Sequence, residues 1–360
     1  MIRQAILWDS LGGGRVRCRV CRWRCVVEPG QRGHCLTREN RGGELFTLIY
    51  ATVSSLQAAP IEMKPLFHFF PGTSWLSLGS LGCNFRCPGC QNWEIAHAQP
   101  DDAPRGGAGI LPAEQGIAGW KPAPQAVQDL DPAEAVDQAI THGCKGLSWT
   151  YNEPTLWLEY TLDVGRLARP RGLLAHYVTN GFATPDALDA IAPYLDAYRV
   201  DIKAFNPDAY RRLANITDFE GILETAERAK RTHGLHVECV TNIVPGYNDD
   251  DTQLGDLAGW IVRALGPDTP WHVTRFVPHL DLSDVPATPV ATLERAREIG
   301  LSRGLQYVYL GNVPGHPAEN TYCHVCGALL IQRQGHRVVA NHLLNGLCPF
   351  CAAPIPGRWQ

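Results

Sequence analysis

The chain reads GSLGCNFRCPGCQNW over residues 79–93, and this stretch decides the interpretation of the whole sequence. Its three cysteines have the spacing C-x3-C-x2-C and directly follow a short strand predicted over 76–80. One loop of this kind can wrap around a single metal cluster, with each thiolate reaching a different corner. A [4Fe–4S] cube generally takes four cysteine ligands, so three ligands leave one iron open for chemistry. The alternative is a zinc site that borrows its fourth ligand from elsewhere in the chain.

Cysteine is frequent in this chain, and it is grouped. There are 13 cysteines in 360 residues, and four pairs have the spacing C-x2-C, where chance predicts about 0.5. An odd number of cysteines in so long a chain does not suggest a disulfide framework. Eleven fall into three groups, and the two that stand alone, Cys144 and Cys239, are interpreted as buried apolar side chains. The grouping predicts metal or cluster binding.

The N-terminal group offers four thiolates within 18 residues, at Cys18, Cys21, Cys25 and Cys35. Tetrahedral zinc held by all four is one interpretation, since short segments without a core fold by binding metal. An auxiliary iron–sulfur cluster is a second, and unligated redox-active thiols are a third. Arginines between positions 15 and 41 make this segment basic, which we interpret as solvated charge on a small metal module rather than as an RNA surface.

The C-terminal group consists of Cys323, Cys326, Cys348 and Cys351, with the spacing C-x2-C-x21-C-x2-C. This spacing is typical of a zinc ribbon, in which two knuckles each present a pair of thiolates to one closed site. We expect structural zinc here, with a rubredoxin-like iron as the alternative.

Composition limits the class of protein. Apolar residues make up 45% and charged residues 19% of the chain, which indicates a globular protein. The formal net charge of −4 gives no drive toward nucleic acid or an anionic membrane, so neither is expected as a partner. No apolar run reaches the roughly 20 residues needed to span a bilayer, and no signal peptide is recognised at the N-terminus. We therefore expect a cytoplasmic protein.

Strand-like and helix-like segments alternate along the centre of the chain. Strands are predicted over 76–80, 146–150, 173–179, 197–203, 235–241, 272–276 and 306–310. Helices are predicted from a capping box at 131–134 onward and over 155–168, 185–194, 219–232, 252–265 and 292–303. The alternation predicts right-handed βαβ units around a parallel sheet, an α/β fold of the partial (βα)6 TIM-like barrel type. We expect a Cys-rich metal-binding module at 1–45, the barrel at 46–318 with an irregular insertion at 100–124, and a zinc-ribbon-like module at 319–360.

The C-x3-C-x2-C loop resembles the signature of radical S-adenosylmethionine enzymes. The resemblance implies that Cys83, Cys87 and Cys90 ligate a [4Fe–4S] cluster whose open iron is chelated by the methionine part of S-adenosylmethionine. It also implies that reductive cleavage of S-adenosylmethionine gives a 5′-deoxyadenosyl radical, which abstracts hydrogen from a substrate that the sequence does not identify. Phe85, inside the loop, matches the position where the superfamily often places an aromatic side chain over the adenine.

Two further segments resemble the same enzymes at the ends of predicted strands. Tyr-Asn-Glu-Pro at 151–154 is similar to the Gly-Gly-Glu-type motif that meets the amino group of S-adenosylmethionine, so Asn152 and Glu153 are candidate cofactor contacts. On its own this segment also fits a plain helix start. Val-Thr-Asn-Gly at 178–181 adds Asn180 as a candidate contact, with turn chemistry as the alternative.

The segment 199–203, Arg-Val-Asp-Ile-Lys, alternates charged and apolar residues. With a period of two, Arg199, Asp201 and Lys203 share one face, which we expect inside the barrel, while the apolar face meets the helices. The segment resembles the Asp-x-Lys of glycyl-radical activating enzymes, which faces the cofactor, so Asp201 and Lys203 are candidate cofactor contacts. The alternative is a solvent-facing edge strand. Together with His272 and Arg275, Arg199 hints at an anionic group on the substrate.

The whole chain resembles the radical S-adenosylmethionine member of the AmmeMemoRadiSam system, which is related to pyruvate formate-lyase activating enzymes. The matching segments are 18–40, 60–72, 83–93, 271–276, 307–315 and the C-terminal group. The resemblance implies an electron donor of flavodoxin or ferredoxin type, and AMMECR-like and Memo-like proteins as partners. A glycyl-radical-enzyme activase acting on a protein partner is the alternative within enzymes. A non-catalytic iron–sulfur or zinc protein for electron transfer or binding is the alternative from another class, and it requires that four ligands close every cluster.

Overall fold

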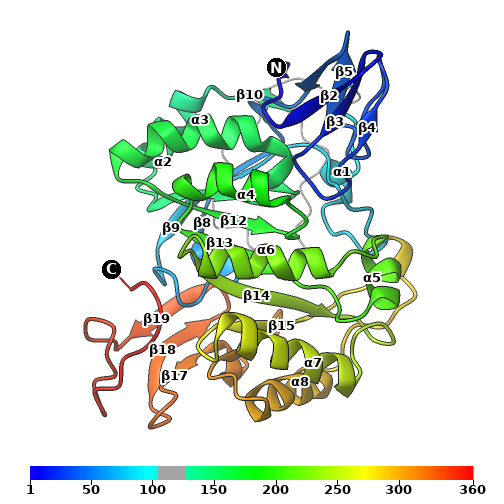
Figure 1. The fold of residues 1–360 in the computed structure, drawn as a ribbon. Coiled ribbons are helices and arrows are strands. Elements are labelled where there is room, and N and C mark those ends of the chain that lie inside the picture. The colour runs from blue at the N-terminus through cyan, green and yellow to red at the C-terminus, as the bar shows by residue number, and fades with distance from the viewer. Residues whose placement is uncertain (102, 104–126, 360) are drawn as a thin grey trace.

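The centre of the molecule is a mixed β-sheet (Figure 1). The structure is a computed structural model, and it describes residues 1–101, 103 and 127–359. Within these residues the sheet has eight strands, in the spatial order β16 (Val308–Gly311), β15 (Trp271–Arg275), β14 (His236–Ile243), β13 (Ala197–Asp201), β12 (Leu174–Thr179), β11 (Gly146–Trp149), β9 (Ser74–Gly79) and β8 (Ser55–Pro60). Neighbouring strands are parallel except for β8 and β9, which pair antiparallel.

Helices connect the parallel strands and lie against one face of the sheet (Figure 1). They are α2 (Pro132–Thr141), α3 (Leu158–Ala168), α4 (Pro185–Ile191), α6 (Glu220–Arg231), α7 (Asp251–Trp260) and α8 (Val290–Ser302). The sequence favours these starts: Asp131 caps α2 by accepting from the N–H of Ala133, and Pro132 lies in the first turn. Two shorter helices, α1 (Trp93–Ala96) and α5 (Pro207–Ala214), follow the three-cysteine loop and β13.

The strands divide their side chains between the helix-facing side of the sheet and an inner side. In β13, Tyr198 and Val200 are buried in the main hydrophobic core, so the alternating Arg199 and Asp201 lie on the inner side. Because β13 lies between β12 and β14, the alternative of a solvent-facing edge strand is wrong. The inner side therefore carries charge inside the molecule.

The segment 61–72 crosses the inner side near the amino ends of the strands. Phe69 packs against Trp75 of β9 and His176 of β12, with ring centroids 5.5 and 6.4 Å apart. The backbone N–H groups of Phe67 and His68 donate to the carboxylate of Glu238 in β14, at 3.0 and 2.8 Å. The segment therefore links β9 to β14 across the inside of the fold.

The predicted parallel strands are all present, which confirms the α/β class. The strand β8 and the helix α5 were not expected. The sequence of β8, SLQAAP, has little intrinsic strand preference, so its pairing depends on the neighbouring β9. The partial (βα)6 TIM-like barrel stays a prediction, because the observed sheet is mixed and β8 extends one edge. The predicted insertion at 100–124 lies, apart from residues 100, 101 and 103, outside the described residues.

Small sheets precede and follow the central one. The first part of the chain forms one sheet of β2 (Trp8–Gly12), β3 (Arg15–Cys18) and β4 (Val26–Val27), and another of β1 (Arg3–Gln4), β6 (Glu44–Thr47) and β5 (Arg38–Arg41). A two-stranded pair joins β7 (Thr52–Val53) to β10 (Gln128–Asp129). The last part forms a sheet of β17 (Thr321–Tyr322), β18 (Leu329–Gln334) and β19 (Arg337–Asn341).

The two end parts attach to the centre differently. In the N-terminal part, Leu45 belongs to the main core, and Arg38 pairs with Glu159 of α3 at 2.7 Å with both side chains buried. The C-terminal part packs through a separate apolar cluster that contains Leu330 and Tyr309. The two parts lie at opposite corners of the molecule, with the N-terminal strands on the side of α1 (Figure 1). The division into modules at residues 45 and 318 remains a prediction.

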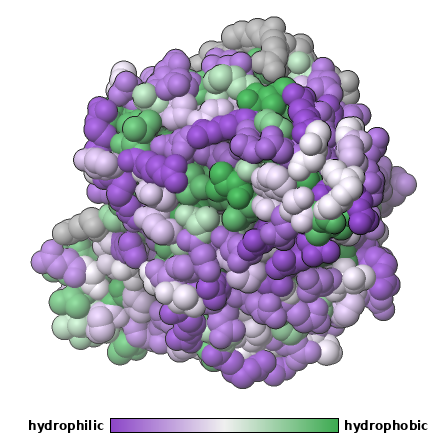
Figure 2. All heavy atoms as spheres, turned by 45° about the horizontal axis from the view of Figure 1, so that its top comes forward, coloured by the Kyte–Doolittle hydropathy of each residue, from purple (hydrophilic) through white to green (hydrophobic). Residues whose placement is uncertain are grey.

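The C-terminal part exposes apolar side chains. Val325, Leu344 and Phe350 are more than half exposed, and Figure 2 shows hydrophobic spheres in green at its lower left, where this part of the chain lies.

Among the described residues, no helix is both long enough and apolar enough to cross a bilayer.

Candidate active site

The three-cysteine loop leaves the carboxyl end of β9 and is tied to the end of β11. Asn152 accepts a hydrogen bond from the N–H of Ser80 at 3.0 Å and donates one to the carbonyl of Gly82 at 2.8 Å. Beyond the cysteines, Asn92 donates to the carbonyl of Tyr151 at 2.7 Å. Both stems of the loop are thus held by residues 151 and 152. In this structure Asn152 positions the loop, and its predicted contact with a cofactor stays a prediction.

Glu153 lies at the end of β11 with its carboxylate fully buried. It accepts hydrogen bonds from the N–H of Thr155, the hydroxyl of Thr179 and the N–H of Asn180, at 3.0, 2.7 and 2.8 Å. Burial raises the pKa of Glu153, and these donors lower it again in part. The carboxylate joins the ends of β11 and β12, and its charge is close enough to Cys83 to raise the pKa of that thiol.

Asn180 reaches the loop from the end of β12. Its side-chain N–H₂ donates to the side-chain oxygen of Asn84 at 2.7 Å and lies 3.9 Å from Sγ of Cys83. Its own side-chain oxygen accepts from the N–H of Phe182 at 3.0 Å, which fixes the orientation of the amide. The structure therefore brings the predicted residue Asn180 next to the first cysteine of the loop.

Lys203 and Asp201 reach the loop from the end of β13. Burial alone would lower the pKa of Lys203, but the carboxylate of Asp201 and the thiols of Cys87 and Cys90 raise it above its usual value. Asp201 also forms an ion pair with Arg199, with 2.9 Å between Oδ1 and Nη1. A lysine held in its charged form thus lies beside the second and third cysteines.

The three thiols of the loop lie among these residues. Burial raises the pKa of each thiol, to about 11 for Cys90 and further for Cys83, where the charge of Glu153 adds to the effect. Thiolates rather than thiols ligate metals, so binding of iron releases these protons. Three thiol groups on one loop, with a lysine beside two of them, fit an anionic iron–sulfur cluster better than a closed four-ligand zinc site.

Phe85 lies inside the loop but packs into the protein. The side chain is buried in the main core, and its ring lies 5.3 Å from that of Phe182. The described contacts give Phe85 a packing role, and its contact with an adenine stays a prediction.

The N-terminal four-cysteine group lies against the same loop. Cys18, Cys21 and Cys35 are buried, and burial raises the pKa of Cys18 to about 11, although the charge of Arg38 acts in the opposite direction. Gly82 has φ of +81°, and a side chain there would collide with Thr37 and approach the carbonyl of Cys35. The loop therefore requires glycine at this position, where the two cysteine-bearing segments touch.

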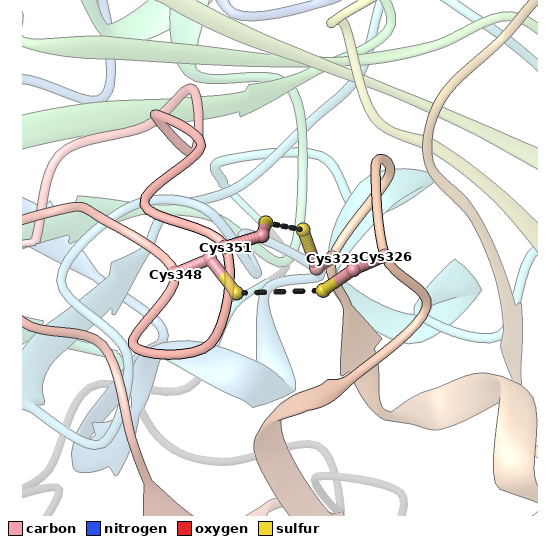
Figure 3. A group of neighbouring side chains, drawn as sticks. All are labelled: Cys323, Cys326, Cys348 and Cys351. Atoms are coloured by element: carbon pink, nitrogen blue, oxygen red, sulfur yellow. Dashed lines mark hydrogen bonds between the residues drawn. The ribbon is translucent and has the colours of Figure 1, made fainter.

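The C-terminal cysteines form the tightest thiol group of the described residues (Figure 3). Cys323 and Cys351 are 3.6 Å apart between sulfurs, Cys326 and Cys348 are 3.7 Å apart, and all four sulfurs lie within 4.8 Å of one another. A tetrahedral zinc with bonds of about 2.3 Å has sulfur–sulfur edges of about 3.8 Å. Although burial alone would raise it, hydrogen bonds from the backbone N–H of residues 350 and 351 and from the neighbouring thiols lower the pKa of Cys348 below its ordinary value. This group can hold one metal ion.

Two of the three polar residues that hinted at an anionic substrate, His272 and Arg275, have hydrogen-bond partners within the protein. His272 pairs with Glu238 at 2.6 Å, and Arg275 donates to the carbonyl of Thr288 at 2.9 Å. The third, Arg199, keeps a buried side-chain nitrogen, Nε, that has no hydrogen-bond partner among the residues described.

Sequence reasoning missed residues that hold the site together. Thr179 supports Glu153, Asn92 ties down the loop, and Trp23 donates to the carbonyl of Asn84 at 2.7 Å. The position of Asn92, two residues after the last cysteine, was the available signal for one of them. Trp23 lies far from the loop in sequence and gave no such signal.

Comparisons with known proteins agree with this geometry. The sequence profile of the Radical SAM superfamily matches residues 78–261, which include the three-cysteine loop and the strands from β11 to β14. An uncharacterized protein of Methanocaldococcus jannaschii is 42% identical over 356 residues, which cover 98% of this chain and 99% of that protein. The isethionate sulfite-lyase activating enzyme of Nitratidesulfovibrio vulgaris is 28% identical over 123 residues, which cover 34% of this chain and 39% of that protein.

Solved structures show a looser similarity. A domain of a pyruvate-formate lyase-activating enzyme from Bacteroides vulgatus aligns with a TM-score of 0.41 and 15% identity, over 46% of this chain and 99% of that one. SuiB of Streptococcus suis aligns with a TM-score of 0.44 and 13% identity, over 70% of this chain and 51% of that one.

The profile match covers half of the chain and contains the residues that surround the three cysteines. Membership of this superfamily implies a [4Fe–4S] cluster and S-adenosylmethionine as cofactors. The chain therefore belongs to the radical SAM superfamily and is a radical S-adenosylmethionine enzyme.

Proposed function

We propose that this enzyme removes a hydrogen atom from a small molecule or a peptide as part of the AmmeMemoRadiSam system. The observation that carries the proposal is the convergence of three thiols, Lys203 and Asn180 at the carboxyl ends of neighbouring strands. In α/β folds of parallel strands, these ends are where active sites are built. The assignment to this system rests on the resemblance along the whole chain.

Cys83, Cys87 and Cys90 are the residues that would hold the [4Fe–4S] cluster, and the donor set suits one, since iron–sulfur clusters are held by thiolates. With S-adenosylmethionine bound, the cluster supplies a one-electron reductive cleavage that leads to abstraction of a hydrogen atom. Lys203 places a positive charge beside two of the thiolates, which favours the anionic state of the site. Asp201 holds that lysine charged and fixes Arg199 through its ion pair.

The loop is held still by its neighbours. Asn152 fixes the stem that precedes the cysteines, while Glu153 and Asn180 fix the strand ends next to Cys83. Preorganised polar groups of this kind act without having to rearrange during the reaction. We assign Asn152, Glu153, Asn180, Asp201 and Lys203 to cofactor binding on the strength of these positions and the family resemblance.

The two flanking cysteine groups receive separate metal assignments in this proposal. The C-terminal group holds structural zinc, because its sulfur–sulfur distances suit one tetrahedral ion. The N-terminal group holds either zinc or an auxiliary iron–sulfur cluster, and its contact with the three-cysteine loop favours a metal that supports that loop. Measurement of iron and zinc per chain in the reconstituted protein separates these two assignments.

A glycyl-radical-enzyme activase is the second candidate function. The 28% identity to the isethionate sulfite-lyase activating enzyme supports it, over a third of the chain. An activase takes hydrogen from a glycine of a large protein partner, whereas the first candidate takes it from a small molecule or peptide. AMMECR-like and Memo-like proteins, and an electron donor of flavodoxin or ferredoxin type, are the partners of the first candidate.

The test measures whether deuterium is transferred from a substrate to 5′-deoxyadenosine. The reduced, reconstituted enzyme is incubated with S-adenosylmethionine and deuterated candidate substrates, with and without AMMECR-like and Memo-like proteins. The proposal predicts deuterium in 5′-deoxyadenosine from a small molecule or peptide. Deuterium arriving only from the glycine of a large protein partner would support the activase instead. Absence of 5′-deoxyadenosine under every condition would contradict both.

A further inference from the structure

Buried charges on the inner side of the sheet generally have partners of opposite charge. The buried Glu238 of β14 lies 2.8 Å from His236 and 2.6 Å from His272, and the buried Arg199 of β13 lies 2.9 Å from the partly exposed Asp201. Such pairing is expected, because an unpaired buried charge is costly. Lys64 departs from this pattern.

Lys64 lies on the segment 61–72 and is only 4% exposed. Its Nζ lies 4.8 Å from the centroid of the Tyr151 ring, and within the described part of the chain no carboxylate is paired with it. Burial, with a smaller contribution from Arg199, lowers the pKa of Lys64 to about 8, so the amine remains charged at neutral pH. The face of one aromatic ring offsets only part of the cost of burying that charge.

His176 of β12 is the second buried polar group that lacks a partner within the described residues. Its ring is fully buried against Trp75, with 5.0 Å between centroids, and among the described residues neither ring nitrogen has a hydrogen-bond partner. Burial and then the charges of Lys64 and Arg199 hold the pKa of His176 well below its usual range, so the ring is neutral. A neutral imidazole offers one N–H donor, and leaving it unpaired in the interior costs free energy.

Two neighbouring strands add polar atoms of the same kind. Arg199 lies diagonally across from His176, because His176 pairs with Ala197 in the register of β12 and β13. Although Arg199 has one acidic partner, its buried Nε has no hydrogen-bond partner in the part of the chain that the structure describes. Ser148 pairs directly with His176 in the register of β11 and β12, and its buried hydroxyl also has no hydrogen-bond partner within residues 1–101, 103 and 127–359. Three adjacent strands and the segment 61–72 therefore direct donors toward the same part of the inner side.

We propose that Lys64, His176 and Arg199 bind an anionic oxygen group of the substrate, a carboxylate or a phosphate. Lys64 supplies a full positive charge, while Arg199, His176 and the hydroxyl of Ser148 supply hydrogen-bond donors. One anion satisfies these unpaired donors and balances the charge of Lys64 at the same time. The inference names the chemical class of the substrate, and it rests on the proposed function.

The anion site is connected to the predicted cofactor contacts. Asp201 joins Arg199, through an ion pair, to Lys203, whose charge adjoins the thiols of the loop. Tyr151, whose ring faces Lys64, is held at its backbone carbonyl by a side chain of the same loop. A substrate anchored at Lys64 by its anionic end therefore has its remaining part close to the three-cysteine loop.

The test measures the binding of inorganic phosphate and, separately, of succinate to the full-length reconstituted protein by isothermal titration calorimetry at pH 7. The two probes distinguish a phosphate site from a carboxylate site. Lys64→Met removes the charge and keeps the length of the side chain, and Lys64→Arg restores the charge. Lys145→Met is the matched control, because Lys145 also lies over an aromatic ring, 4.7 Å from the centroid of Phe70, but is exposed. The iron content of each variant reports whether it has folded.

We expect one of the probes to bind the wild-type protein, and Lys64→Met to weaken that binding by about tenfold or more. Lys64→Arg should restore binding, and Lys145→Met should leave it unchanged. The titration is repeated with S-adenosylmethionine present, because the proposal requires the probe and the cofactor to bind together. Failure of both probes to bind, equal binding by Lys64→Met, or displacement of the probe by S-adenosylmethionine overturns the proposal.

A second variant tests the proposal if Lys64→Met does not fold. If Lys64→Met loses its iron, His176→Leu is titrated under the same conditions, and it should weaken binding of the same probe. Unchanged binding by His176→Leu contradicts the proposal. Probe binding does not need cleavage of S-adenosylmethionine. If the anion site is wrong, 5′-deoxyadenosine still forms. If the proposed function is wrong, 5′-deoxyadenosine does not form.

Discussion

The indole N–H of Trp23 donates a hydrogen bond to the backbone carbonyl of Asn84, 2.7 Å away. This contact joins the N-terminal four-cysteine segment to the three-cysteine loop. Thr37 and the carbonyl of Cys35 lie against Gly82 of the same loop. Metal binding by the N-terminal group is therefore expected to stabilise the three-cysteine loop.

Replacing Trp23 tests this connection. Trp23→Phe keeps an aromatic ring but removes the N–H donor, which leaves the carbonyl of Asn84 without that bond and costs about 1 kcal/mol. We expect faster loss of iron from the reconstituted cluster, measured as iron per chain after gel filtration. Trp8→Phe is the matched control, because the Trp8 indole donates to the carbonyl of Ala5, away from the loop. Equal iron retention in both variants would refute the connection.

Lys203 is expected to set the reduction potential of the cluster. Its charged amine lies beside the thiols of Cys87 and Cys90, where it stabilises added negative charge. Lys203→Met should therefore make the cluster harder to reduce, and Lys203→Arg should retain most of the wild-type potential. The measurement is a redox titration followed by electron paramagnetic resonance, with Lys230→Met as a control, since that lysine bonds to Thr269. An unchanged potential in Lys203→Met would show that its charge lies too far from the cluster to matter.

The C-terminal group is expected to hold one zinc ion that stabilises its sheet. Cys348→Ser removes one of four ligands from a group whose sulfurs lie within 4.8 Å of one another. We expect loss of about one zinc per chain and a lower melting temperature, because structural zinc contributes directly to folding. Cys144→Ser, at a buried cysteine outside the three groups, should keep the wild-type zinc content. Normal zinc content in Cys348→Ser would exclude Cys348 as a ligand.

Stability is expected to fall as the pH falls below about 6.5. Burial lowers the pKa of His68 to about 3, whereas an unfolded histidine titrates near 6.5. Between these values the unfolded state binds more protons than the folded state, so the free energy of unfolding decreases as the pH decreases, by up to about 1.4 kcal/mol per pH unit for this group. Glu238, whose pKa lies well below its usual value despite burial because of hydrogen bonds from His236 and His272, acts in the same direction at lower pH.

A denaturation series between pH 7.5 and 4 measures this effect. His68→Asn should show a shallower decrease than the wild-type protein, and His142→Asn, at an exposed position, should follow the wild type. Identical slopes for His68→Asn and the wild type would show that the buried ring does not contribute.

Much of the fold could be predicted because two kinds of segment alternate regularly along the chain. In one kind the apolar residues recur with the period of a strand, and in the other with the period of a helix. The cysteine spacing drew attention to the three-cysteine loop, and in the structure Asn152, Glu153 and Asn180 lie beside it at the strand ends. Parallel strands bring their carboxyl ends together, so residues distant in sequence meet there without any local signal.

The remaining features depend on tertiary contacts. Lys64 follows a single turn of 3-10 helix at Ile61–Met63, and only the packing of the segment 61–72 across the sheet buries it. The strand β8 has a polar and alanine-rich sequence, so its place in the sheet comes from pairing with β9. The metal of the N-terminal group could not be predicted either, because four closely spaced thiolates suit zinc and iron–sulfur clusters alike.

The most direct test is the electron paramagnetic resonance spectrum of the reduced, reconstituted enzyme before and after addition of S-adenosylmethionine. If Cys83, Cys87 and Cys90 hold a cluster with one open iron, the wild-type signal changes when S-adenosylmethionine is added. Cys87→Ala then loses this response and 5′-deoxyadenosine formation. Cys144→Ala behaves as the wild type. A wild-type signal that S-adenosylmethionine leaves untouched, or full 5′-deoxyadenosine formation by Cys87→Ala, would contradict the account.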